Sequence, residues 1–205
     1  MKEKDIVIAA KVLSAVFNPF LLPVVGLLAL FLFSYLSLLP WQAKLYILLL
    51  VATFTILLPT TLIRIFRHWR GWSPEDMSVR ERRIVPYIIS IICYLLCYYV
   101  ITTNHIPYTI GSVVMASLLI QVVCAIINHW WMISTHTAVI GGVAGAIMAF
   151  AEIFWFNPLW WLSIIILLAG VVGTSRIILK QHTLAQVVTG FLVGMVCAIL
   201  AVLFI

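Results

Sequence analysis

Charged side chains are scarce in this 205-residue sequence, of which Asp, Glu, Lys and Arg together make up only 9%. A soluble globular domain carries about 25% of these residues. Hydrophobic residues instead make up 65% of the chain, and the mean hydropathy is +1.21. Because so few charges cannot cover a water-exposed surface, the composition excludes an ordinary soluble domain and predicts an integral membrane protein.

Cysteine is also scarce, and its positions exclude two further kinds of site. The four cysteines all fall inside long apolar runs, at Cys93, Cys97, Cys124 and Cys197. Their spacing matches neither a metal site nor a disulfide framework, so we interpret them as packing residues and expect no metal and no other cofactor. The N-terminus lacks a small-residue cleavage site after a short apolar core, so we expect no removable signal peptide.

Basic residues outnumber acidic ones by 12 to 6, which gives a net charge of +6. They lie in short segments between apolar runs, where they report membrane orientation more simply than nucleic-acid binding. Eleven of the twelve would share a face with the N-terminus, and only Lys44 lies near the other face. The positive-inside rule therefore predicts that the first face is cytoplasmic, in what we expect to be a bacterial inner membrane.

Long apolar runs occupy most of the chain. They cover residues 15–38, 42–66, 86–103, 108–131, 137–155, 159–178 and 184–204. Each is close to the length of about 20 residues that a helix needs to cross a bilayer. Backbone amides in lipid must bond within their own segment, and these runs lack the alternation of a barrel strand. The sequence therefore predicts an all-α, polytopic membrane bundle of six to seven transmembrane helices, forming one domain over residues 1–205.

The first run is the least regular of the seven. Asn18, Pro19 and Pro23 lie near its start, where a proline can kink the helix or leave it lying on the membrane surface. Six full crossings and one imperfect crossing are the alternative to seven.

Three polar clusters lie at the ends of predicted spans, far apart in sequence but on the same predicted face. The first is the loop from Asp76 to Pro86, which carries Arg80, Arg82 and Arg83. The second is Ser134-Thr135-His136, and the third is Ser175-Arg176 with His182 and Gln186. Between them, Gly141, Gly142 and Gly145 are typical of close helix packing in lipid, and we expect this packing to bring the second and third clusters together.

These residue types suit the binding and transfer of a phosphoryl group. Arginine guanidinium groups can hold a phosphate bidentately, and Ser134 with the free amides of a helix N-terminus can add further donors. Two histidines can divide the work, one as a nucleophile that becomes phosphorylated and the other as the acid that protonates the leaving oxygen. The clusters together predict a phosphoryl-transfer site that works without a metal.

The spacing Ser175-Arg176-x5-His182-x3-Gln186 resembles a signature of the type 2 phosphatidic acid phosphatase superfamily, in which the last residue is aspartate. Ser134-Thr135-His136 resembles a second signature of that family, Pro-Ser-Gly-His, with Ile133 and Thr135 in place of proline and glycine. The family's first signature, Lys-x6-Arg-Pro, has its best counterpart in the loop from Arg80 to Pro86. The resemblance is strongest over residues 108–205 and implies a phosphatase-like core from about residue 76 to residue 205.

The resemblance also implies a role for each residue of the clusters. His182 would be the nucleophile and His136 the general acid. The phosphate would be bound by Arg176, Ser134, Ser175, Arg80, Arg82 and Arg83. Gln186 departs from the family, because its amide oxygen can accept the ring N–H of the nucleophilic histidine but brings no negative charge.

The implied activity is hydrolysis of a lipid phosphate or a polyprenyl diphosphate, with that substrate and the surrounding membrane lipids as partners. A cytoplasmic site favours a head group such as that of phosphatidylglycerol phosphate, whereas the opposite face favours polyprenyl diphosphate or lipid A. Two alternatives accompany this hypothesis. The loop arginines can serve only as topology determinants, and Gln186 can mark an inactive relative that binds phospholipid or a partner protein. A transporter is disfavoured because Glu152 is the only acidic residue within a run.

Overall fold

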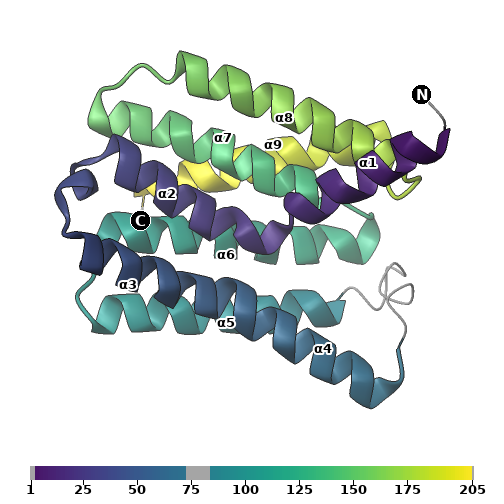
Figure 1. Cartoon of the computed structure of the whole chain (residues 1–205), viewed down its shortest axis with the longest axis horizontal. Helices are drawn as coiled ribbons and strands as arrows, with labels where there is room; N and C mark the ends of the chain where they lie inside the picture. The colour runs from purple at the N-terminus through teal and green to yellow at the C-terminus, as the bar shows by residue number, and fades with distance from the viewer. Residues whose placement is uncertain (1–2, 73–83, 205) are drawn as a thin grey trace.

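A computed structural model describes residues 3–72 and 84–204 as a bundle of long helices, and no strand occurs among these residues (Figure 1). Six helical segments in this part of the chain are long and apolar enough to cross a membrane. They are α3 (Trp41–Ala52) joined through the π-helix η3 (Thr53–Leu57) to α4 (Leu58–Arg70), α5 (Ile84–Thr103), α6 (Tyr108–Trp130), α7 (Thr135–Phe154), α8 (Leu159–Ile178) and α9 (Leu184–Phe204). The predicted all-α membrane bundle is confirmed.

The N-terminal segment is broken, as its prolines predict. It consists of α1 (Glu3–Val16), the short 3-10 turn η1 (Pro19–Leu21) and α2 (Leu22–Phe33), which ends before a second 3-10 turn, η2 (Tyr35–Leu38). Segments Asp5–Leu21 and Pro23–Leu32 are bent by 77°, and together they would supply a seventh crossing. The Asn18 side chain stabilises the break, because its Oδ1 accepts a hydrogen bond from the Phe20 N–H at 3.2 Å.

Helix α1 starts earlier than the apolar run, which begins at residue 15. Asp5 and Lys11 interrupt the apolar pattern, but both side chains are exposed, whereas Ala10 is buried. The helix is therefore amphipathic, and its buried face packs against α8. A search for uniform hydrophobicity does not recognise a helix of this kind.

Helices α7 and α9 make the most extensive helix contact of the described bundle. Glycines line it from both sides, at Gly141, Gly145, Gly190 and Gly194. A Cβ at Gly141 would overlap the carbonyl oxygen of Phe191, and one at Gly194 would overlap that of Ala138. The two backbones therefore touch directly, which confirms for Gly141 and Gly145 the close packing predicted from the sequence.

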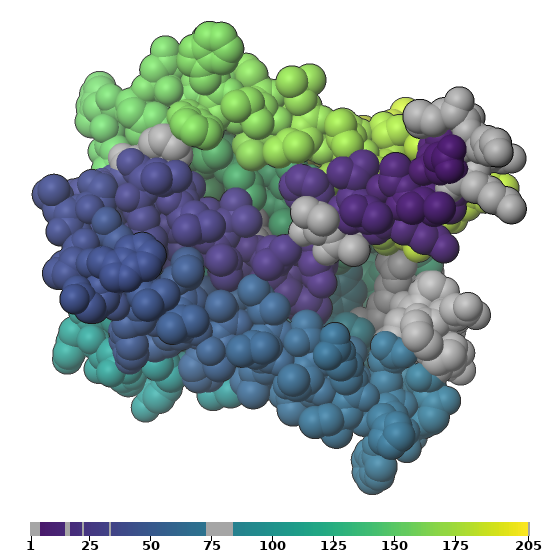
Figure 2. Space-filling view, in the orientation of Figure 1, coloured from purple at the N-terminus to yellow at the C-terminus, as the bar shows by residue number. Residues whose placement is uncertain are grey.

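The connections of the bundle separate into two ends (Figure 1). The α6–α7 and α8–α9 connections lie at the end where α1 begins and α4 stops, and the 104–107 and 155–158 connections lie at the other end. The second and third polar clusters consequently share one end, as expected. In Figure 2, the N-terminal helices cover one face of the C-terminal helices, consistent with contacts of α1 with α8 and of α2 with α6 and α7.

Candidate active site

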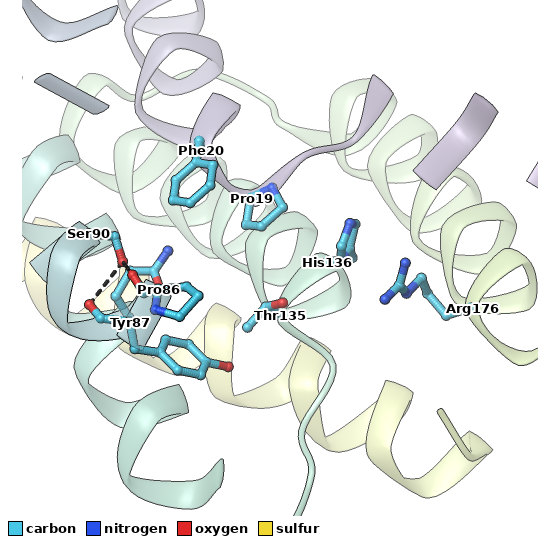
Figure 3. A pocket seen from close by; sticks show the side chains of 9 residues that line it. Pro19, Phe20, Pro86, Tyr87, Ser90, Thr135, His136 and Arg176 are labelled. Atoms are coloured by element: carbon cyan, nitrogen blue, oxygen red, sulfur yellow. Dashed lines mark hydrogen bonds between the residues drawn. The ribbon is translucent and has the colours of Figure 1, made fainter. Parts of the chain in front are cut away.

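A cavity of about 220 Å³ opens at the end of the bundle that carries the two polar clusters. Its walls come from η1, α5, α6, α7 and α8. They are formed by Pro19, Phe20, Pro86, Tyr87, Ser90, Gln121, Thr135, His136 and Arg176. Figure 3 shows Arg176 and His136 side by side at one end of the cavity, with Tyr87 and Ser90 at the other. One end is therefore suited to an anion, while the rest is apolar or uncharged.

Arg176 lies in the last turn of α8 and is 8% exposed. Its guanidinium points toward His136 in Figure 3, and its Nη1 donates a hydrogen bond to Ser14 Oγ of α1 at 2.5 Å. Near the edge of a bilayer, a largely buried guanidinium offers several donors in a fixed plane and interacts with an anion more strongly than it would in bulk water.

His136 lies in the first turn of α7. Its Nε2 is 3.5 Å from the same Ser14 Oγ, so one hydroxyl group connects the guanidinium and the imidazole. The residue before α7 is Ser134, whose fully buried Oγ has no hydrogen-bond partner among the described residues. Ser134 itself does not line the cavity, whereas the next two residues, Thr135 and His136, do. The N–H groups in the first turn of a helix can donate to a phosphate oxygen.

His182 lies between α8 and α9 and is 6% exposed. Its Nδ1 is 3.2 Å from Gln186 Oε1, which also accepts the Thr183 backbone N–H at 3.1 Å. The backbone N–H of Gln186 donates in return to Thr183 Oγ1 at 3.4 Å, which completes a capping box at the start of α9. Gln186 therefore stabilises the helix terminus and also holds the histidine.

The same bonds assign the tautomer of His182. A backbone N–H can only donate, so the side-chain atom of Gln186 that receives the Thr183 N–H is the amide oxygen. The His182 Nδ1 that contacts this oxygen must consequently be the donor, which leaves the lone pair on Nε2. An imidazole with its lone pair on Nε2 is the tautomer that can attack phosphorus through this atom.

A hydrogen bond between backbone groups joins the second and third polar clusters. The Ser134 N–H donates to the Gln186 carbonyl at 3.4 Å, which ties the start of α7 to the first turn of α9. His136 and His182 are each a few residues from this bond, although the sequence separates them by a full pair of helices. His182 is not among the residues that line the cavity. The structure thus places His136 and Arg176 in one cavity and His182 on the neighbouring α8–α9 connection.

Not every predicted phosphate ligand reaches the cavity. The Ser175 hydroxyl donates to the Val171 carbonyl of its own helix at 2.8 Å, and Ser175 lines a separate groove between α1 and α8. Because successive helical residues point about 100° apart, Ser175 and Arg176 face different sides of α8. Arg80, Arg82 and Arg83 lie outside the described residues.

Motif analysis missed one residue that lines the cavity, Gln121, and one that contacts the cavity residues Arg176 and His136, namely Ser14. Gln121 is a buried amide near the middle of α6, and an isolated polar side chain within a membrane span is a recognisable signal for function. Ser14 has no such signal, because it lies in an ordinary amphipathic helix outside all three clusters. Its position depends on how α1 packs against α8.

A family model described as the PAP2 superfamily matches residues 91–205, which is more than half of the chain and includes all of α6 to α9. No curated protein and no solved structure matches the sequence. The matched region contains His136, Arg176, His182 and Gln186, whereas Ser14 and Pro19 lie outside it.

Proposed function

Because the chain belongs to the PAP2 superfamily, we propose that it is a membrane phosphatase that hydrolyses a lipid phosphate or polyprenyl diphosphate through a phosphohistidine. The observation that supports this most directly is the hydrogen bond from His182 Nδ1–H to Gln186, since it places the lone pair of the ring on Nε2, the atom proposed to attack phosphorus. Family membership and the six apolar helices make the protein an integral membrane protein of this phosphatase superfamily.

The reaction proceeds in two displacements. In the first, the Nε2 lone pair of His182 forms a bond to phosphorus while the bond from phosphorus to the leaving oxygen breaks, and His136 gives that oxygen its proton. In the second, a water molecule loses a proton to His136 and attacks the phosphohistidine, which breaks the P–N bond and releases orthophosphate. Both histidines return to their starting protonation states, and no metal takes part.

Arg176 and Ser134 bind the non-bridging oxygens in this scheme. The guanidinium offsets the charge that these oxygens carry, and the buried hydroxyl of Ser134 donates a further hydrogen bond. The loop arginines Arg80, Arg82 and Arg83 are proposed to bind the phosphate as well. Ser175 is proposed to bind the phosphate only after its side chain changes rotamer, because its hydroxyl donates a hydrogen bond to a carbonyl of its own helix.

The substrate is proposed to be amphipathic. Pro19, Phe20 and Pro86 give the cavity apolar sides, so a lipid tail can remain within the bundle while its phosphate meets Arg176. A site on the cytoplasmic side of a bacterial inner membrane fits a phospholipid precursor such as phosphatidylglycerol phosphate. A site on the other side fits polyprenyl diphosphate or lipid A.

A panel of phosphorylated lipids tests this proposal. The purified protein in detergent should release orthophosphate from at least one of phosphatidic acid, phosphatidylglycerol phosphate and polyprenyl diphosphate. Release should be unchanged by EDTA, because histidine and arginine provide the nucleophile and the charge. The proposal fails if no lipid of the panel is hydrolysed, or if EDTA abolishes release and a divalent metal restores it.

Gln186 supports a second candidate, an inactive relative that binds phospholipid or a partner protein. An amide orients His182 but does not stabilise the positive charge that the ring acquires as it attacks phosphorus. Under this reading the protein binds orthophosphate without hydrolysing any lipid of the panel.

The variant Gln186→Glu should raise the rate of phosphate release about tenfold, a gain in the range expected for one charge-assisted hydrogen bond. Glutamate has the length of glutamine and also suits the third residue of a capping box, so the contacts with His182 and Thr183 are kept. The rate is measured with the best lipid of the panel. Gln186→Leu is the matched control and should lower it, whereas equal rates for both variants would disprove a role for this side chain.

A further inference from the structure

The hydroxyl of Ser14 occupies a notable position in the candidate site. It accepts the 2.5 Å hydrogen bond from Arg176 Nη1 and lies 3.5 Å from His136 Nε2. We propose that Ser14 is a positioning residue of the phosphate site, which holds the Arg176 guanidinium and the His136 ring in place for an anion. This inference rests on the proposed phosphate site, although not on turnover.

Local chain geometry explains why a serine of α1 reaches this point. Ser14 lies in the last turn of α1, immediately before the break at Asn18 and Pro19. Pro19 and Phe20, in the turn η1 that forms the break, line the same cavity as Arg176. The break thus places three successive parts of the N-terminal segment, namely a helix end, a turn and an aromatic ring, along one wall of the site.

A hydroxyl group suits this position chemically. It can accept two hydrogen bonds and donate one, so it can serve a guanidinium and an imidazole together. When Nη1 is held by Ser14, the plane of the guanidinium is fixed and its remaining N–H groups are directed as a unit. An arginine that is already oriented loses less rotamer freedom when a phosphate binds, so binding is tighter.

The position of Ser14 in the chain adds to the inference. The PAP2 family match starts at residue 91 and therefore does not include α1. Helix α1 nevertheless packs on α8 and is visible as the outermost layer beside it in Figure 2. The N-terminal segment is therefore proposed to complete a site whose histidines and Arg176 come from the C-terminal half.

Orthophosphate binding to the purified protein is the direct test, measured by the concentration dependence of thermal stability in detergent. Ser14→Ala should weaken orthophosphate binding about tenfold, the effect expected for losing one hydrogen bond to a charged group. Ser14→Thr keeps the hydroxyl and should restore most of the affinity. Ser163→Ala is the matched control, because the Ser163 hydroxyl bonds only its own helix at the far end of α8; it should bind like wild type.

A double-mutant cycle separates positioning from a general structural effect. If Ser14 acts through the guanidinium, Ser14→Ala should change affinity little in an Arg176→Lys background. The inference is overturned if Ser14→Ala binds orthophosphate as tightly as wild type or more tightly, or if its effect is the same in both backgrounds. A protein that shows these affinities but hydrolyses no lipid would refute the proposed enzyme activity and leave the positioning role intact.

Discussion

Replacing His182 with alanine is expected to reduce phosphate release by about a thousandfold or more, the scale seen when a catalytic nucleophile is removed. The reason is chemical, because the variant lacks the proposed nucleophile, a ring that is held through Nδ1–H by Gln186 and carries its lone pair on Nε2. The rate is measured on the best lipid substrate in detergent. A phosphorylated protein, labile to acid and stable to alkali, should be trapped with wild type and not with the variant.

His68→Ala is the matched control for that experiment. His68 lies in the last turn of α4 and is exposed, so its removal should leave the rate within about twofold, as is usual for surface substitutions. Equal rates for wild type and His182→Ala would remove the phosphohistidine from the proposal. Trapping of phosphate on His136 instead would reverse the two roles.

The variant Arg176→Lys should lower kcat/KM by about a hundredfold, within the range for disturbing a buried, hydrogen-bonded charge. Lysine keeps the positive charge, but it is a point charge and cannot offer the planar set of donors that Arg176 presents beside His136. The loss should appear in both KM and kcat, because the guanidinium binds the phosphate in the ground state and in the transition state. Steady-state kinetics on the best lipid measure both.

Arg64→Lys controls for loss of an arginine in general. Arg64 is exposed on α4, where a headgroup contact accepts either side chain, so its kinetics should match wild type. If Arg176→Lys also matched wild type, phosphate binding would depend on charge alone and the planar-donor argument would be wrong.

The positions of the membrane spans could be predicted from the sequence because lipid imposes one strong condition, a helix of fixed minimum length with few charges. The six regular spans follow this condition, and their observed limits agree closely with the apolar runs. Helix α1 did not follow it, since Asp5 and Lys11 face outward while Ala10 packs inward. An amphipathic helix is stabilised by packing against another helix, and an average of hydropathy along the sequence gives no information about that packing.

In the candidate site, one contact could be predicted from the sequence and another could not. The contact between His182 and Gln186 could be predicted, because residues four apart at a helix start are neighbours in space. The contact of Ser14 with Arg176 joins residues 162 positions apart and depends on the packing of α1 upon α8. A sequence motif can predict a contact between residues of one helix, whereas a contact between two helices can be recognised only in the assembled bundle.

The glycine contact between α7 and α9 has a consequence for how a lipid can enter. Because Gly141 and Gly194 let backbone meet backbone, sliding one helix along the other would drive a bulkier side chain into a carbonyl oxygen. Helix α7, which carries His136, and helix α9, which begins just after His182, are thus held in a single register. Room for an incoming tail must come from helices that are separated by side chains. Helix α1, which is followed by a bend beside the cavity and contacts Arg176 through Ser14, is one of these.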